Sequence, residues 1–207
     1  MVHIIHNNGP ENVSDSVIIE AIQQLNEGFS QTGYFANGNG VDVGIQFCLA
    51  QRDPDGNFTT GINRVVSPLT NSTLAEGNEL KNLSCWNSFD YLNIWVVSGG
   101  GGYANFPFAH GLEFDGIVIG VETLGSAGSA VLIHEAGHYL ALYHTFSNGC
   151  ENDDCLLNGD RVCDTPPDNS TVPYYCNTPV NSCSTDTDSG FDSDQNDQTW
   201  NYMDYGA

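Results

Sequence analysis

Residues 134–144 read His-Glu-Ala-Gly-His-Tyr-Leu-Ala-Leu-Tyr-His, and this stretch decides how the rest of the chain is interpreted. On an α-helix, His134 and His138 are four residues apart, so both imidazoles project from one face. Two histidines placed in this way can bind one zinc ion, and Glu135 beside them can accept a proton from a water at the metal. The spacing therefore predicts a helix that carries a zinc site.

His144 can join this site only if the helix ends before it. In a continuous helix, six residues at about 100° each would turn His144 roughly 120° away from the face of His138. We therefore expect a helix from about Ser126 to Leu142 that ends near Ala141 and lets the chain turn back. Three histidines would then leave one open position in a tetrahedral catalytic zinc site.

A second informative element is the pentapeptide Asn-Tyr-Met-Asp-Tyr at residues 201–205. Together with the long histidine motif, it resembles the metzincin metallopeptidases, in which a tight turn carries a methionine beneath the metal. More narrowly, the chain is similar to the pappalysin family of ulilysin-like and cytophagalysin-like enzymes. Further supporting residues are His144-Thr145-Phe146 and Gly159-Asp160-Arg161-Val162-Cys163-Asp164-Thr165-Pro166, with weaker similarity at residues 45–50 and 91–97.

The resemblance implies an α+β metzincin-like catalytic domain. A twisted sheet and the active-site helix would lie above the cleft, and an irregular part, stapled by disulfides and calcium, would lie below it. Met203 would pack under the zinc without binding it. Tyr205 would be a catalytic tyrosine that swings between the metal and the oxyanion, although a packed aromatic residue in a turn is the alternative interpretation.

Calcium is the second cofactor that the resemblance implies, with Asp160 and the backbone of Thr165 as ligands. Hard cations prefer carboxylate and carbonyl oxygens, which are abundant in this part of the chain. A solvated acidic loop is the alternative interpretation. Further candidate ligands are Asp153, Asp154, Asp164 and Asp168.

The sequence departs from the family pattern in two places. The motif has glycine where this chain has Ala141, and alanine in the left-handed conformation that commonly ends a helix costs roughly 1–2 kcal/mol. Metzincins also continue past the methionine turn into a helix, whereas this sequence ends at Ala207. We therefore expect a truncated or processed catalytic domain.

Five of the seven cysteines lie between residues 150 and 183. Such clustering indicates disulfides formed in an oxidising compartment. A second zinc site with cysteine ligands is the alternative, but the chain has no Cys-x-x-Cys pair. The expected pairs are Cys150 with Cys183, Cys155 with Cys163, and Cys48 with Cys85. The resemblance implies that the partner of Cys176 is a cysteine shortly after the methionine turn. This sequence lacks that cysteine, so Cys176 would remain free.

Composition narrows the class of protein. A chain of 207 residues is long enough for a single domain with a substantial core, here 1–207. No stretch approaches the apolar length of a membrane span, and residues 1–6 lack the pattern of a signal peptide. The 26 Asp and Glu against 4 Lys and Arg exclude a nucleic-acid partner held through its phosphates. This acidity suits calcium binding, a saline habitat or cationic substrates.

Hydrophobic patterning predicts a mixed α/β fold. A helix capped by Ser14 should carry an apolar stripe from Val17 to Phe29. His3 and His6 fall on opposite faces of the first strand and should be structural or exposed. The resemblance puts residues 101–109, which His110 follows, at the rim of the cleft, where an edge strand can pair with the substrate backbone. The expected strands are residues 2–6, 41–49, 59–66, 91–97 and 116–121. Residues 69–83 are ambiguous, with a helix as one interpretation.

The sequence thus predicts a secreted, extracellular, monomeric zinc endopeptidase that acts on protein or peptide substrates, cationic ones in particular. Glu135 would be its general base. Two alternatives stay open: a catalytically weak zinc- and calcium-binding adhesion module derived from a protease, and a zinc hydrolase of non-peptide amides.

Overall fold

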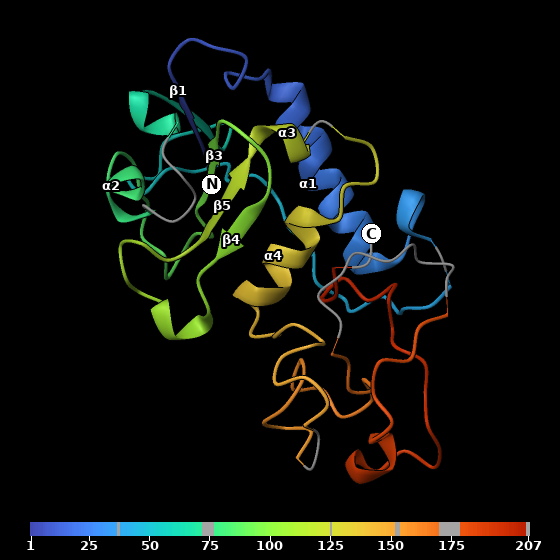
Figure 1. Ribbon diagram of the computed structural model, residues 1–207. Helices are drawn as coiled ribbons and strands as arrows, with labels where there is room; N and C mark the ends of the chain where they lie inside the picture. The colour runs from blue at the N-terminus through green and yellow to red at the C-terminus, as the bar shows by residue number, and fades with distance from the viewer. Residues whose placement is uncertain (37, 72–76, 125, 152–153, 170–178, 206–207) are drawn as a thin grey trace. The chain divides into compact units, whose positions relative to one another are not determined.

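The computed structural model describes residues 1–36, 38–71, 77–124, 126–151, 154–169 and 179–205 (Figure 1). The chain divides into two compact units, residues 1–139 and 140–207, which are described separately below. None of the described helices combines the length and the apolar character required to cross a membrane.

A five-stranded sheet forms the centre of the first unit, in the order β2-β1-β3-β5-β4. Strands β1 (Val2–His6), β2 (Ile62–Val66), β3 (Ile94–Val97) and β5 (Ile117–Gly120) are parallel, and β4 (Gly102–Ala104) runs antiparallel to β5 at one edge. Every residue of β1, β3 and β5 is buried, as expected for parallel strands that are covered on both faces.

Successive side chains of a strand point to opposite faces of the sheet, so each face has its own core. On one face, Ile5, Trp95, Val97 and Val118 pack with Leu80 of α2 (Gly77–Lys81). On the other face, α4 (Val131–Tyr139) packs against β4 and β5 and against α1 (Asp15–Ser30), and α3 (Val121–Leu124) lies beside both helices (Figure 1).

The remaining described helices are short 3₁₀ turns. They span Gly33–Phe35, Pro68–Asn71 and Pro107–Ala109 in the first unit and Asp186–Ser189 in the second. The ambiguous stretch at 69–83 thus contains all of α2 and all but the first residue of the 3₁₀ turn Pro68–Asn71. Ser14 is the N-cap residue of α1 as expected, but its side chain makes no capping hydrogen bond.

The first predicted strand, residues 2–6, is confirmed, and the strands predicted at 59–66, 91–97 and 116–121 form over shorter ranges. The strand predicted at 41–49 is wrong. Its backbone pairs with α1 instead, because the Asn26 side chain accepts a hydrogen bond from the Phe47 amide at 2.7 Å and donates one to its carbonyl at 2.9 Å. Val41 and Val43 remain exposed.

Both histidines of β1 are buried. His3 Nε2 lies 3.0 Å from Asn93 Oδ1, its Nδ1 lies 2.9 Å from Ser84 Oγ, and its ring stacks on Trp95. His6 Nδ1 accepts a hydrogen bond from the Asn8 amide. These histidines are therefore structural and not exposed. The sequence alone is compatible with either interpretation.

The second unit has little regular structure and is cross-linked by two disulfides. Cys150 is bonded to Cys183 and Cys155 to Cys163, which confirms two of the three predicted pairs. Cys176 lies outside the described residues.

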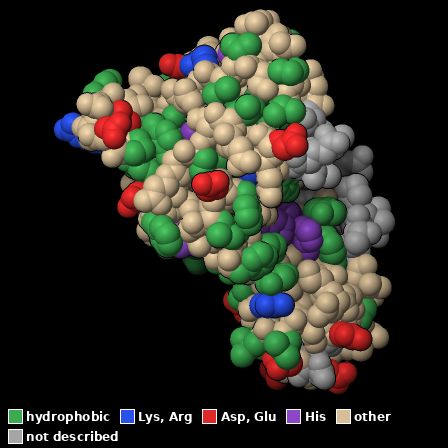
Figure 2. Space-filling view, turned by 90° about the vertical axis from the view of Figure 1, so that its left-hand side faces the viewer, with side chains coloured by type: hydrophobic (Ala, Val, Ile, Leu, Met, Phe, Trp, Pro, Cys, Tyr) green, Lys and Arg blue, Asp and Glu red, His purple; other side chains and the backbone are tan. Residues whose placement is uncertain are grey.

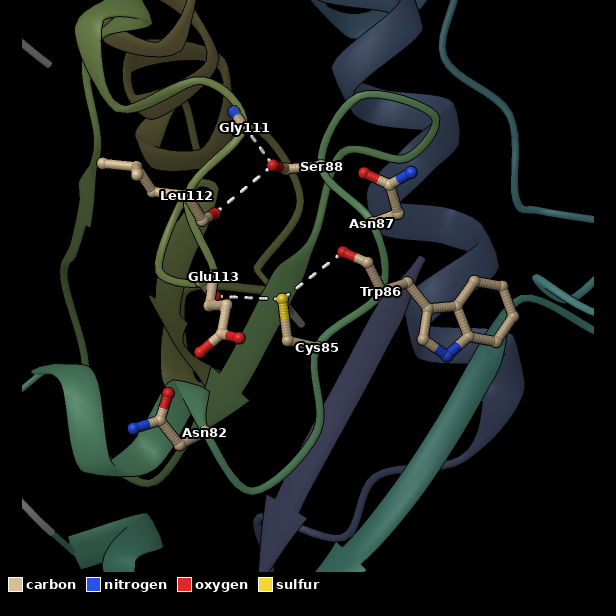
Figure 3. Close-up of a pocket in the computed structure, with 8 residues that line it drawn as sticks. All are labelled: Asn82, Cys85, Trp86, Asn87, Ser88, Gly111, Leu112 and Glu113. Atoms are coloured by element: carbon tan, nitrogen blue, oxygen red, sulfur yellow. Dashed lines mark hydrogen bonds between the residues drawn. The ribbon is translucent and has the colours of Figure 1, made fainter.

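The third predicted pair, Cys48 with Cys85, is wrong, because both thiols are free. Cys48 lines a cavity beside Met1 and Ile22 on the α1 face of the sheet. Cys85 belongs to the core of the opposite face and donates hydrogen bonds to the carbonyls of Glu113, at 2.9 Å, and Trp86, at 3.3 Å (Figure 3). The sheet lies between the two cysteines, so no disulfide can form.

Candidate metal centre

Helix α4 carries the first part of the histidine motif. Leu132, Ile133 and Ala136 are buried and anchor the helix in the core of the first unit. The rings of His134 and His138 lie one turn apart with their centroids separated by 4.6 Å. The predicted helix is therefore present around these two histidines, but it covers Val131–Tyr139 and not the longer range expected from the sequence.

The helix ends in the manner that the position of His144 requires. Ala141 has a φ of 83°, which places an alanine in the left-handed region that glycine usually occupies at a helix end. The chain reverses there, and the candidate ligand nitrogens of His134, His138 and His144 all lie within 4.8 Å of one another. Histidine side chains gather at one place on the surface, bordered by hydrophobic side chains (Figure 2).

Glu135 projects from the same helix and is only 5% exposed. Its Oε2 atom is buried and accepts no hydrogen bond from the part of the chain that the structure describes. Burial raises the pKa of Glu135 to about 7. A carboxyl group with this pKa can both take up and release a proton near neutral pH.

This donor set fits a zinc ion. Three imidazoles around one point match the ligands of catalytic zinc sites. The buried carboxylate oxygen is an acceptor that lacks a donor among the described residues, and a water at the metal would supply one. No other group of three or more His, Cys, Asp or Glu side chains among the described residues meets the same distance limit.

Two neighbours of this helix, Gly102 and Phe106, belong to the segment 101–109 that the resemblance puts at the rim of the cleft, although neither was named individually from the sequence. A Cβ atom at Gly102 of β4 would lie 3.0 Å from Cγ of Glu135, and the ring of Phe106 lies 5.3 Å from that of His138. The run of four glycines at 99–102 was a further signal, since glycine in a strand often marks a close approach. His110 instead pairs with the buried Asp115, with Nδ1 3.3 Å from Oδ2.

In the second unit, the ring of His144 stacks on Phe146 and meets the edge of Tyr205, with centroids 4.6 and 4.9 Å apart. The amide of Thr145 donates a hydrogen bond to the carbonyl of Met203 at 3.2 Å. Met203 is buried, whereas Tyr205 is 46% exposed. The third histidine and the methionine segment are therefore adjacent.

The two residues expected to bind calcium are in contact. Asp160 Oδ2 accepts a hydrogen bond from Thr165 Oγ1 at 2.8 Å, and Oδ1 accepts one from the Val162 amide at 2.9 Å. Asp160 is buried, and burial raises its pKa. The other described candidate ligands make contacts of their own.

Asp168 contacts Thr145 and Ser182, Asp154 binds the amide of Leu156, and Asp153 lies outside the described residues. Asp164 raises the pKa of Asp160 through its charge, after the larger effect of burial.

Comparison with known proteins identifies the family. The family model Peptidase_M43, described as Pregnancy-associated plasma protein-A, matches residues 77–207, which is more than half of the chain. The chain belongs to this family. As a pappalysin-type metzincin, it has the fold and the candidate zinc ligands of a metalloprotease.

Individual relatives agree with this assignment. Mature mirolysin of Tannerella forsythia, solved in complex with a cleaved peptide, is 33% identical with a TM-score of 0.77, and the match covers 99% of this chain and 82% of mirolysin. A protein of Arthroderma benhamiae named extracellular metalloprotease is 28% identical over 99% of this chain and 68% of its own length. An extracellular metalloprotease of Sordaria macrospora is 31% identical over 78% of this chain and 53% of its own length.

Proposed function

We propose that this protein is a secreted zinc endopeptidase that hydrolyses internal peptide bonds of proteins, and that both units form one catalytic domain. The observation that carries the proposal is the group of His134, His138 and His144 beside the buried carboxylate of Glu135. The extracellular metalloproteases among its relatives support secretion.

The three histidines would hold the zinc ion, which activates water and polarises the scissile carbonyl when it is bound. Glu135 would accept a proton from the attacking water and deliver it to the leaving amine. Its burial supports this role, because the pKa of about 7 allows both steps near neutral pH. Tyr205, beside His144, would donate a hydrogen bond to the developing oxyanion.

Strand β4 would hold the substrate. It is paired with β5 on one side only and forms an edge of the sheet, where an extended peptide can add as a further strand. Gly102 of this strand lies against Glu135. A peptide on β4 would therefore pass close to the proposed general base.

The decisive experiment compares the protein with its Glu135→Gln variant on casein and on a peptide library. We expect cleavage at internal bonds by the parent protein, loss of nearly all activity in the variant, and one zinc per chain in both. Cleavage only of small non-peptide amides would support the alternative hydrolase. Zinc binding without any hydrolysis by the parent protein would support the adhesion module.

We also propose a structural calcium ion near Asp160 and Thr165, supported by their contact and by the burial of Asp160. A calcium ion would stabilise the folded state in proportion to its occupancy. A calcium-selective chelator should lower the melting temperature of the zinc-saturated protein. An unchanged melting temperature would refute the site.

Cationic substrates are the third element of the proposal, motivated by the net charge of −22. A negative field attracts peptides that carry Lys or Arg near the scissile bond, and salt screens this attraction beyond about 8–10 Å. Matched basic and acidic peptides should therefore differ most in kcat/KM at low ionic strength. Equal rates at low salt would contradict the proposal.

A further inference from the structure

Lys81 is the only lysine in the sequence, and its side chain is 1% exposed. Lysine is almost never fully buried unless its charge is paired, because an ammonium group loses much hydration energy away from water. An exposed lysine would keep its hydration and would not lose this energy. The contacts of Lys81 therefore indicate what the buried charge does.

The ammonium group of Lys81 lies at the end of α2 and has partners on several sides. Nζ donates hydrogen bonds to Asn105 Oδ1 and to the carbonyl oxygen of Phe114, the latter at 2.7 Å. It also lies over the rings of Tyr103 and Trp95, at 4.7 and 5.2 Å from their centroids. Burial lowers the pKa of Lys81 to about 8, so the group remains mostly charged at neutral pH.

These contacts hold β4 and the residue that follows it from behind. Side chains alternate along an extended segment, so Tyr103 and Asn105 share the face that Lys81 contacts. Gly102 and Phe106 occupy the alternate positions, which face the opposite side. On that side, Gly102 lies against Glu135, and the ring of Phe106 lies 5.3 Å from that of His138.

The loop that leaves β4 is fixed at several points, among them the hydrogen bond from Cys85 to the Glu113 carbonyl. Its base is held by Lys81, which joins the two ends of residues 105–114 through one ammonium group. Its outer part is held by Ser88, whose hydroxyl accepts a hydrogen bond from the Gly111 amide and donates one to the Leu112 carbonyl (Figure 3). The Asn105 amide also donates a hydrogen bond to the Gly116 carbonyl at 3.0 Å, and β4 is paired with β5. Lys81 fixes the Asn105 side chain and the Tyr103 ring, so its loss would loosen the strand and the base of the loop together.

We propose that Lys81 is a positioning residue for peptide hydrolysis, which fixes the substrate-binding edge of β4 and the Phe106 ring against His138. This inference rests on the proposed peptidase function. Lys81 touches neither the substrate nor the metal ligands. It acts through Tyr103 and Asn105, on the far side of the sheet from Glu135.

The test replaces Lys81 with Met, which keeps the length and packing of the side chain but removes the charge and the donors. Arg64→Met is the matched control, since it removes one positive charge from a surface ion pair with Asp15. We expect kcat/KM of Lys81→Met to fall about tenfold to a hundredfold, as for a small displacement of catalytic groups. Zinc content should remain at one per chain, and Arg64→Met should retain the activity of the parent protein.

A purely structural role is distinguished by measuring kcat/KM well below the melting temperature of each variant. If the substitution affected only stability, the folded variant would keep the kcat/KM of the parent protein at that temperature. This result would overturn the inference. Asn105→Ala provides a second variant in case Lys81→Met does not fold. It should lower kcat/KM in the same way, and the double variant should be no worse than Lys81→Met alone.

Hydrogen exchange gives a readout that does not depend on peptidase activity. Amides of residues 102–116 should exchange faster in Lys81→Met, whereas those of β3 should not change. If the parent protein cleaves no peptide, the proposed function fails, and hydrogen exchange alone then decides the positioning role. If the parent protein cleaves peptides but Lys81→Met and Asn105→Ala cleave them equally well, only the positioning role fails.

Discussion

Gly102 of β4 and Glu135 of α4 lie so close together that a side chain at position 102 would crowd the glutamate. A Cβ atom at position 102 would lie 3.0 Å from Cγ of Glu135, 3.0 Å from Cδ1 of Ile119 and 3.1 Å from the carbonyl oxygen of Val118. All three neighbours are buried. The carboxylate of the proposed general base is therefore positioned by the absence of a side chain on the adjacent strand.

Gly102→Ala should reduce kcat/KM about tenfold or more, because the added methyl group must displace either Glu135 or the edge strand. Gly100→Ala is the matched control, since the nearest atom to its Cβ would lie at 3.6 Å, an ordinary contact. Peptide cleavage by both variants should be compared at equal zinc content. A fully active Gly102→Ala would show that β4 and Glu135 can separate without cost.

Ala141→Gly should increase the free energy of unfolding by about 1 kcal/mol. Alanine at a φ of 83° costs roughly 1–2 kcal/mol, and the greater freedom of glycine in the unfolded chain offsets part of this gain. Ala36→Gly is the control, because Ala36 is exposed and has a φ of −73°. It should be neutral or destabilising. Urea denaturation of both variants measures the difference in the free energy of unfolding. A destabilised Ala141→Gly would show that the backbone of Ala141 is not strained.

The sequence predicted those parts of the fold that are encoded by local periodicity. The strand at residues 2–6 was predicted and is present as β1, with every residue buried. The histidine helix followed from the spacing of four between His134 and His138. The end of the helix near Ala141 followed from the angular position that His144 needs. In both segments, the local pattern and the tertiary environment demand the same structure.

The failures concern contacts between distant segments. Alternation at 41–49 predicts a strand, but it carries no information about Asn26, whose side chain takes the hydrogen bonds of Phe47. The pairing of Cys48 with Cys85 failed because the cysteines lie on opposite faces of the sheet. Lys81 was not singled out for the same reason, since a charge at the end of a short helix appears exposed until the tertiary structure covers it.

The two disulfides should contribute unequally to stability. In the chain-entropy account, the stabilisation grows with the length of the closed loop, which spans 33 residues for Cys150–Cys183 and 8 for Cys155–Cys163. This predicts losses of about 4 and about 2.5 kcal/mol when each pair is replaced by alanine. Chemical denaturation of the two double variants measures the losses. A larger loss for Cys155–Cys163 would show that native contacts around the shorter loop dominate.

His3 should make stability depend on pH in the acidic range. Burial, the largest cause, lowers the pKa of His3 from 6.5 to about 4, although the hydrogen bond with Asn93 opposes this effect. Between these two pH values, the unfolded state binds a proton at this site that the folded state does not. Stability from neutral His3 is therefore complete above pH 6.5 and is lost as the pH falls toward 4.

The difference between the two pKa values corresponds to about 3 to 4 kcal/mol, at about 1.4 kcal/mol per pH unit. His3→Gln keeps an amide donor for Asn93 and removes the titration. The variant should be less stable than the parent protein at pH 7, and the gap between their free energies of unfolding should narrow by a large part of that amount at pH 4. The contribution of the carboxylates to the pH dependence of stability is the same in both proteins and therefore cancels in the difference. Two parallel stability curves from pH 7 to pH 4 would show that the buried imidazole does not couple folding to protonation.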